Sequence, residues 1–162
     1  MVRVFKQCFT KDVPKVTWDD IIHKIEKDCV KKVSERDEGY VSPYVRWVAK
    51  DMRIAPTYVL FARPDSVHPP TLQKAYNEIS AKTGANRMVV YISFSANSQH
   101  YGRHKDTLNV LITQAIGKMS YKFDDGTVHT IGPGDSIFIP KGVYHEPIIH
   151  GPRVTLSLTT VE

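Results

Sequence analysis

The segment GPGDSIFIPKGVYH at residues 132–145 decides the fold of this chain. Its Gly-Pro-Gly start predicts a tight turn, and the apolar run from Ile137 to Ile139 predicts a short strand. The Pro-Lys-Gly sequence at residues 140–142 predicts a second turn. The segment therefore predicts two short strands joined by tight turns, with His145 at the start of the second.

A second segment supplies partners for this histidine. His104 and Asp106 are two positions apart, and residues i and i+2 of a strand project to the same face. With His145 they would form a two-histidine, one-carboxylate triad, which leaves half the coordination sphere of a divalent iron open for O2 and a cosubstrate. We therefore expect His104, Asp106 and His145 to be the metal ligands and catalytic residues. The alternative is three hydrogen-bonded barrel residues without metal.

The last half of the chain is expected to be all strand. From residue 87 onward the apolar residues recur with a period of two, and turn sequences such as Asp124-Asp125-Gly126 separate the runs. Many short strands at even spacing indicate a barrel or jelly roll. The expected strands are Met88 to Phe94, Leu108 to Ala115, Lys118 to Phe123, Thr127 to Ile131, Ser136 to Ile139 and Arg153 to Val161.

The first half is expected to be largely helical. Apolar residues at helical spacing follow a capping-box sequence that begins at Thr17, and they predict a helix to about residue 35. A second helix begins at Pro69-Pro70 and ends at Gly84. Between the two helices we expect a short helix from Val45 to Met52 and a strand from Tyr58 to Ala62. The 162 residues suit one domain, with residues 1–86 as a helical buttress and residues 87–162 as the barrel that holds the metal site.

Composition excludes several classes of protein. The chain is 41% apolar and 24% charged, as in ordinary globular domains, and its apolar runs are too short to span a membrane. Cys8 and Cys29 are too few for a disulfide framework, and no secretory signal begins the chain, so we expect a cytoplasmic protein. The net charge of +5 is carried largely by lysines interleaved with acids, which is typical of a solvated helix face. Nucleic-acid binding is not indicated.

Residues 132–145 resemble the second motif of the cupin superfamily, a Gly-Asp followed by an apolar strand, Pro-x-Gly and a histidine. This resemblance implies a double-stranded β-helix, so the fold class is mainly β with N-terminal helices. The first cupin motif is His-x-His with a Glu shortly after, but here Asp106 replaces the second histidine and no Glu follows closely. The change to three ligands resembles the iron- and 2-oxoglutarate-dependent oxygenases that share this barrel.

The anchor for the cosubstrate differs from one branch of that group to another. His104, Asp106, Gln114 and Gly117 resemble the Jumonji-C oxygenases, whose basic anchor sits two positions after the glycine, but Met119 stands there and cannot form an ion pair. Lys118 and Lys122 are expected to point away from the face of Met119, because side chains alternate along a strand.

The segment around Arg153 resembles the prolyl-hydroxylase type, in which an arginine follows the distal histidine by about nine positions and a Ser or Thr assists it. Tyr101 also fits the Tyr-x-Arg-His-x-Asp sequence of that group. This resemblance implies that Arg153 binds the far carboxylate of 2-oxoglutarate, with Thr155, Tyr101 and Tyr121 assisting. Arg153 in a structural ion pair, and tyrosines in the core, are the alternatives. His100, His129 and His150 are expected at the surface.

The resemblance as a whole implies an Fe(II)- and 2-oxoglutarate-dependent dioxygenase that hydroxylates an unidentified substrate. Its cofactors would be Fe(II) and 2-oxoglutarate, O2 would be its cosubstrate, and a homodimer is a conceivable assembly because cupins often pair. Two other hypotheses stay open. One is a metal cupin without 2-oxoglutarate, such as a small-molecule dioxygenase or isomerase, and the other is a non-catalytic binding protein with the cupin fold.

Overall fold

The computed structural model describes residues 1–6, 15–29, 38–42, 45–48, 57–62, 68–98 and 100–160. These residues contain two helices and eleven strands. In chain order the elements are β1 (Arg3–Phe5), α1 (Trp18–Cys29), β2 (Glu38–Ser42), β3 (Val45–Val48), β4 (Thr57–Ala62), α2 (Pro70–Thr83), β5 (Arg87–Ser93), β6 (Val110–Ile116), β7 (Met119–Phe123), β8 (Val128–Ile131), β9 (Ser136–Ile139), β10 (His145–Ile149) and β11 (Arg153–Thr159).

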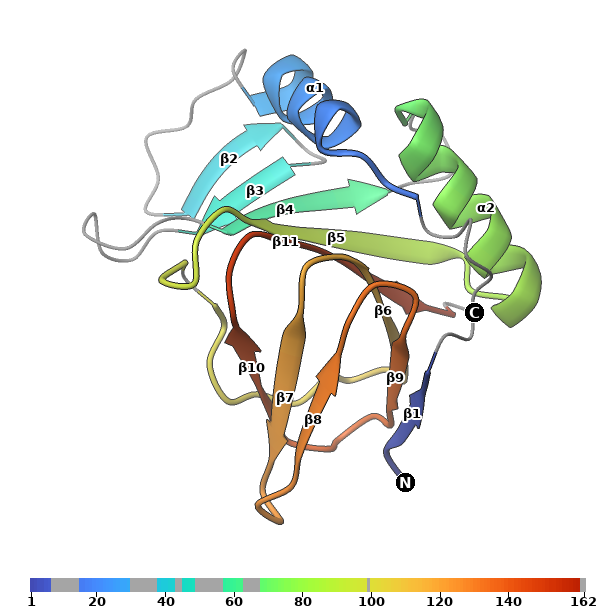
Figure 1. The fold of residues 1–162 in the computed structure, drawn as a ribbon, viewed down its shortest axis with the longest axis vertical. Helices are drawn as coiled ribbons and strands as arrows, with labels where there is room; N and C mark the ends of the chain where they lie inside the picture. The colour runs from blue at the N-terminus through green and yellow to red at the C-terminus, as the bar shows by residue number, and fades with distance from the viewer. Residues whose placement is uncertain are drawn as a thin grey trace.

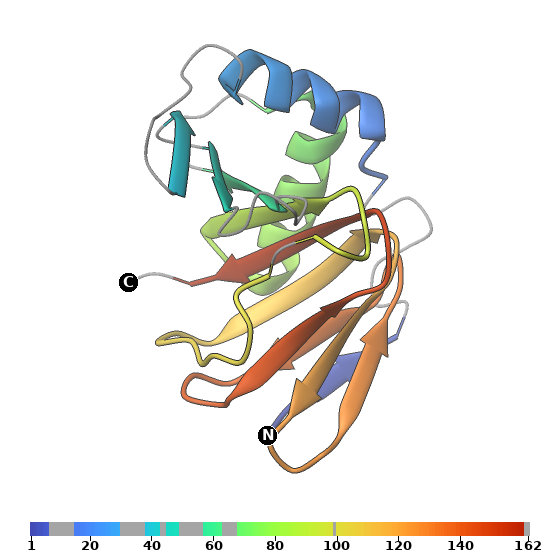
Figure 2. The same cartoon turned by 90° about the vertical axis from the view of Figure 1, so that its left-hand side faces the viewer.

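Two antiparallel sheets face each other across the lower part of the molecule (Figure 1 and Figure 2). The larger sheet has the strand order β1-β9-β6-β11-β5-β4-β3-β2, and the smaller has the order β10-β7-β8. From β5 onward the chain passes repeatedly between them, because β6, β9 and β11 join the large sheet while β7, β8 and β10 join the small one. This winding is a double-stranded β-helix, or jelly roll, as the turn-rich last half of the sequence predicted.

The two faces of the large sheet bury different residues. Met88, Val90 and Ile92 of β5 pack outward, against the helical layer that Figure 1 shows above the sheet. Their alternate neighbours in β5 face the inside of the barrel. The interior has its own apolar cluster, which consists of Val110, Ile112, Met119, Tyr121, Phe123, Ile131, Ile137, Ile139 and Ile149.

Both expected helices are present. Thr17 begins α1 by accepting a hydrogen bond from the Asp20 backbone N–H at 3.3 Å, and Ile21 on the expected apolar stripe is fully buried. Residues 30–37, to which that helix was expected to extend, lie outside the described residues. Gly84 ends α2 in the left-handed conformation, at φ 72°, as expected. None of the described helices is long and apolar enough to cross a membrane.

The expectation for the segment between the helices was partly wrong. The strand at Thr57–Ala62 is confirmed, but residues 45–48 form strand β3 and not the start of a short helix. β3 pairs with β4 on one side and with β2 on the other, so the region expected to be a helical buttress also lengthens the large sheet. A short segment with Val at both ends satisfies its backbone groups by pairing with an open sheet edge, and sequence periodicity carries no sign of that edge.

Candidate metal centre

The three expected ligands come together, although not all on strands. His104 lies in the connection between β5 and β6, where its backbone exchanges two hydrogen bonds with that of His145, at 2.9 and 2.8 Å. Asp106 lies in the same connection, and its carbonyl oxygen accepts a bond from the Gly142 N–H at 2.9 Å. The expectation that His104 and Asp106 share a regular strand was therefore wrong. The bridge to the small sheet and the bond to the Pro-Lys-Gly turn place this connection instead.

The side chains of the triad converge on one point. Asp106 Oδ2 is 3.6 Å from His145 Nε2, and Asp106 Oδ1 is 4.0 Å from His104 Nε2. The ligand atoms of the three residues all lie within 4.8 Å of one another, and no other such group occurs among the described residues. One divalent ion can contact all three side chains from this position, so the residues present fit a metal.

Hydrogen bonds at the far side of each imidazole fix which nitrogen faces the ion. Nδ1 of His104 is 2.8 Å from the Gly102 carbonyl oxygen, and Nδ1 of His145 is 3.0 Å from that of Val143. Because a carbonyl only accepts, each Nδ1 carries the hydrogen and each Nε2 keeps a lone pair for a metal. Burial lowers the pKa of His145, which favours the neutral form that a metal requires.

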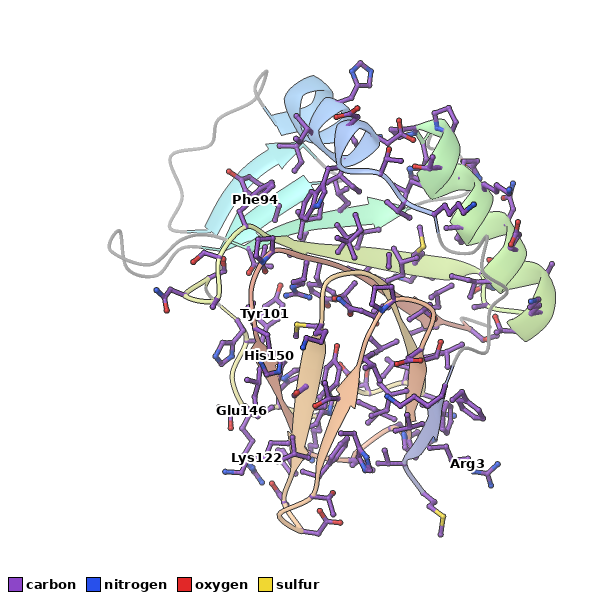
Figure 3. The ribbon with its side chains drawn as sticks, in the orientation of Figure 1. Arg3, Phe94, Tyr101, Lys122, Glu146 and His150 are labelled. Atoms are coloured by element: carbon purple, nitrogen blue, oxygen red, sulfur yellow. The ribbon has the colours of Figure 1, made fainter. Side chains whose placement is uncertain are left out.

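The triad opens into a cavity inside the barrel. Its wall comes from both sheets and from the connection that carries His104. The lining residues are Thr57, Val59, Tyr91, His100, Tyr101, His104, Asp106, Ile112, Met119, Tyr121, His145, Pro147, Arg153, Thr155 and Ser157. His100, which the sequence placed at the surface, is half-buried and belongs to this wall. Glu146 and Lys122 project outward from the small sheet, away from the cavity (Figure 3).

Arg153 brings a positive charge into this cavity. Its side chain is buried with 4% of the residue exposed, its Nε donates to Ser93 Oγ at 2.9 Å, and its guanidinium carbon lies 5.6 Å from the centre of the Tyr91 ring. Within the described part of the chain, no carboxylate forms an ion pair with it. Burial lowers the pKa of Arg153 to about 10, so the guanidinium is still charged at neutral pH. An unpaired buried cation of this kind requires an anionic ligand or solvent.

The residues expected to assist Arg153 occupy different positions. Tyr121 is buried beside Arg153, and its pKa is raised by burial, so its hydroxyl stays protonated. Thr155 is buried and donates its hydroxyl hydrogen to Gln114 Oε1 at 2.9 Å. Tyr101 is 44% exposed and contacts Tyr91 edge to face, at 6.2 Å between ring centres. It therefore lies nearer the opening of the cavity than Tyr121 and Thr155 do.

The Jumonji-C anchor position is apolar, as expected. Met119 is fully buried in the cavity wall, while Lys118 and Lys122 are exposed on the opposite side of the strand. Gly117 lies in the turn just before β7 with φ 73°, and a Cβ atom there would collide with the Pro152 carbonyl oxygen. A glycine is therefore required where this turn passes the start of β11, next to Arg153.

Three residues that surround the Arg153 side chain were missed from the sequence. Ser93 holds the Nε of Arg153, Thr57 holds Ser93, and Tyr91 covers the guanidinium. Tyr91 and Ser93 lie within the strand predicted from Met88 to Phe94, and Thr57 directly precedes the strand predicted from Tyr58 to Ala62. Their positions beside Arg153 depend on strand register. No local sequence signal marks them.

Comparison with known proteins supports this fold. No family model matches the sequence, and no curated protein matches it. Among solved structures, YcfD, a ribosomal oxygenase from Escherichia coli, superposes with a TM-score of 0.67 at 17% identity, over 99% of this chain and 48% of that one. YcfD in complex with cobalt and 2-oxoglutarate gives a TM-score of 0.66 at 17% identity, over 100% and 48%.

The complex of YcfD with cobalt and succinic acid gives a TM-score of 0.67 at 15% identity, over 99% of this chain and 48% of that one. This likeness supports the double-stranded β-helix that the two sheets form. The chain spans about half the length of YcfD, so the likeness establishes the fold and not the activity of the whole protein.

Proposed function

We propose that this protein is an Fe(II)- and 2-oxoglutarate-dependent oxygenase that hydroxylates a C–H bond of an unidentified substrate. One observation carries the proposal: a single cavity holds a three-ligand metal face and a buried guanidinium without a carboxylate partner among the described residues. A 2-oxo acid with a second carboxylate at its far end satisfies both features at once.

The metal ligands and Arg153 have separate roles in this proposal. His104, Asp106 and His145 hold the metal through two neutral imidazole nitrogens and one carboxylate, which leaves positions open for the 2-oxo acid and O2. Bound iron supplies the redox chemistry that couples oxidative decarboxylation of 2-oxoglutarate to substrate hydroxylation. Arg153 binds the distal carboxylate by charge-assisted hydrogen bonds, which are strong because the site is desolvated.

Two further groups complete the anchor. The protonated Tyr121 hydroxyl, buried beside Arg153, is placed to donate to the same carboxylate. Thr155 donates to Gln114 in this structure, so its help requires that hydrogen to turn toward the ligand. Ile112 and Met119 add apolar wall, which limits access of water to the reacting groups.

The structural neighbours support the proposal. YcfD from E. coli is a ribosomal oxygenase, and two of its structures are complexes of cobalt with 2-oxoglutarate or with succinic acid. The cytoplasmic location of this chain and its pairing as a homodimer stay predictions.

The test is turnover of 2-oxoglutarate by the purified protein. With Fe(II) and ascorbate, we expect succinate release above an Asp106→Ala control, in which the loss of the carboxylate removes charge that balances the metal. Calorimetry on Co(II)-loaded protein measures 2-oxoglutarate binding independently of turnover. Metal binding without 2-oxoglutarate binding and without succinate would refute the proposal in favour of a metal cupin that uses no 2-oxo acid. Absence of metal binding as well would favour a non-catalytic protein.

A further inference from the structure

Strand register places three polar residues in one row across the large sheet. Ser93 of β5 lies opposite Arg153 of β11 on one side and opposite Thr57 of β4 on the other. Residues directly opposite in antiparallel strands project to the same face, so all three side chains point to the cavity side. The exposed fractions of Thr57, Ser93 and Arg153 are 4%, 0% and 4%, respectively.

The row is joined by hydrogen bonds. The Nε–H of Arg153 donates to Ser93 Oγ at 2.9 Å, and Ser93 Oγ is 2.9 Å from Thr57 Oγ1. Because the arginine already directs a hydrogen at Ser93, the hydroxyl hydrogen of Ser93 is free to point to Thr57. The two hydroxyls therefore form a short buried chain that ends on the guanidinium.

This chain determines which edge of the guanidinium a ligand meets. A guanidinium can bind a carboxylate through its Nε side or through its two terminal nitrogens. Ser93 occupies the Nε of Arg153, so the terminal nitrogens are left for the cavity. A guanidinium that is fixed in this way loses less freedom when the ligand binds than one that must be ordered by the ligand.

We propose that Ser93 and Thr57 are positioning residues, which aim the terminal nitrogens of Arg153 at the distal carboxylate and so favour 2-oxo diacids over chelators that lack that carboxylate. The inference rests on the proposed use of 2-oxoglutarate. It also gives a role to β4, which adds Thr57 to the cavity wall from outside the strands that wind the barrel.

The test compares two ligands on Co(II)-loaded protein by calorimetry. Binding of 2-oxoglutarate depends on both the metal and Arg153. Oxalate chelates the metal but has no distal carboxylate for Arg153 to bind. We expect Ser93→Ala to raise the dissociation constant of 2-oxoglutarate about tenfold, because a hydrogen bond to a charged group is lost, and to leave that of oxalate unchanged. Thr57→Val should raise the 2-oxoglutarate constant about threefold, and Thr57→Ser, which keeps the hydroxyl, should stay near the parent.

A matched control separates positioning from general stability. Thr113 Oγ1 and Ser136 Oγ form a similar buried pair at 2.8 Å between β6 and β9, away from the cavity lining. Thr113→Val should lower the melting temperature much as Thr57→Val does and change neither dissociation constant. If Ser93→Ala is insoluble, the pair Thr57→Val and Thr57→Ser still decides the question.

The outcomes distinguish this inference from the proposed function. If the parent binds oxalate but not 2-oxoglutarate, the proposed function is wrong and the inference falls with it. If the parent binds 2-oxoglutarate, yet neither Ser93→Ala nor Thr57→Val changes the ratio of the two dissociation constants, only the positioning role is refuted.

Discussion

Replacement of Arg153 by methionine should separate ligand binding from stability. The arginine is buried at 4% exposure, and among the described residues no carboxylate forms an ion pair with it. Methionine fills a similar elongated volume without a charge. We expect Arg153→Met to lose 2-oxoglutarate while it keeps the fold and the metal.

The size of the ligand effect follows from the burial of the site. Removal of one partner from a desolvated, hydrogen-bonded charge pair costs about 2–5 kcal/mol. Since 1.4 kcal/mol corresponds to a factor of ten, the dissociation constant of 2-oxoglutarate should rise by about 30-fold to about 4000-fold. Metal affinity should stay within about threefold of the parent, because the ligand residues are unchanged.

The stability effect has opposing contributions. Desolvation of an isolated charge costs several kcal/mol, so its removal stabilises the fold. The variant also loses the bond to Ser93, worth about 1.5–3 kcal/mol, and the contact with the Tyr91 ring, worth about 0.5–2 kcal/mol. The free energy of unfolding of the metal-free protein should therefore stay within about 2 kcal/mol of the parent or rise.

Calorimetry on Co(II)-loaded protein and urea unfolding of the metal-free protein measure the two effects. Lys122→Met is the control, because this exposed lysine projects away from the cavity. The substitution should change neither the 2-oxoglutarate affinity nor the free energy of unfolding. Unaltered 2-oxoglutarate affinity in a folded Arg153→Met protein would refute the assignment of the anchor. A loss of more than about 3 kcal/mol of stability would show instead that Arg153 is mainly structural.

Three further predictions concern the metal site and its support. His104→Ala and His145→Ala should each abolish stoichiometric Co(II) binding, measured by metal analysis after gel filtration, whereas the exposed His150→Ala should retain it. Burial lowers the pKa of His145, so below roughly pH 6.5 the unfolded chain takes up a proton that the folded chain resists. The metal-free protein should thus lose stability to urea as the pH falls, and His145→Gln should flatten that part of the profile; parallel profiles would contradict this reasoning. Gly117→Ala should lower the free energy of unfolding by at least about 2 kcal/mol, because φ is positive there and the added Cβ would collide with Pro152. This loss should be larger than that of Gly126→Ala, because Gly126 also has a positive φ but a Cβ there would meet nothing within 4 Å.

The sequence alone predicted the barrel because its signals there are local. Turn sequences such as Asp124-Asp125-Gly126 before β8 and Gly132-Pro133-Gly134 before β9 separate short apolar runs, and such signals need no knowledge of distant residues. The grouping of His104, Asp106 and His145 was expected from the His-x-Asp sequence together with the resemblance of residues 132–145 to the cupin motif. The apolar side chain of Met119 also excludes the usual anchor position by residue type alone, because a thioether cannot form an ion pair with a carboxylate.

Only the tertiary structure decided what surrounds these residues. Strand β3 depends on pairing with β2 and β4, and the connection that carries His104 depends on its bridge to β10, so neither has a periodicity of its own. The row of Thr57, Ser93 and Arg153 depends on register across three strands that are far apart in sequence. Register is set by long-range pairing and packing, and a shift of one residue would turn Arg153 out of the cavity. The physical reason is that a residue type specifies what a side chain can do, whereas the sheet specifies which other side chains it meets.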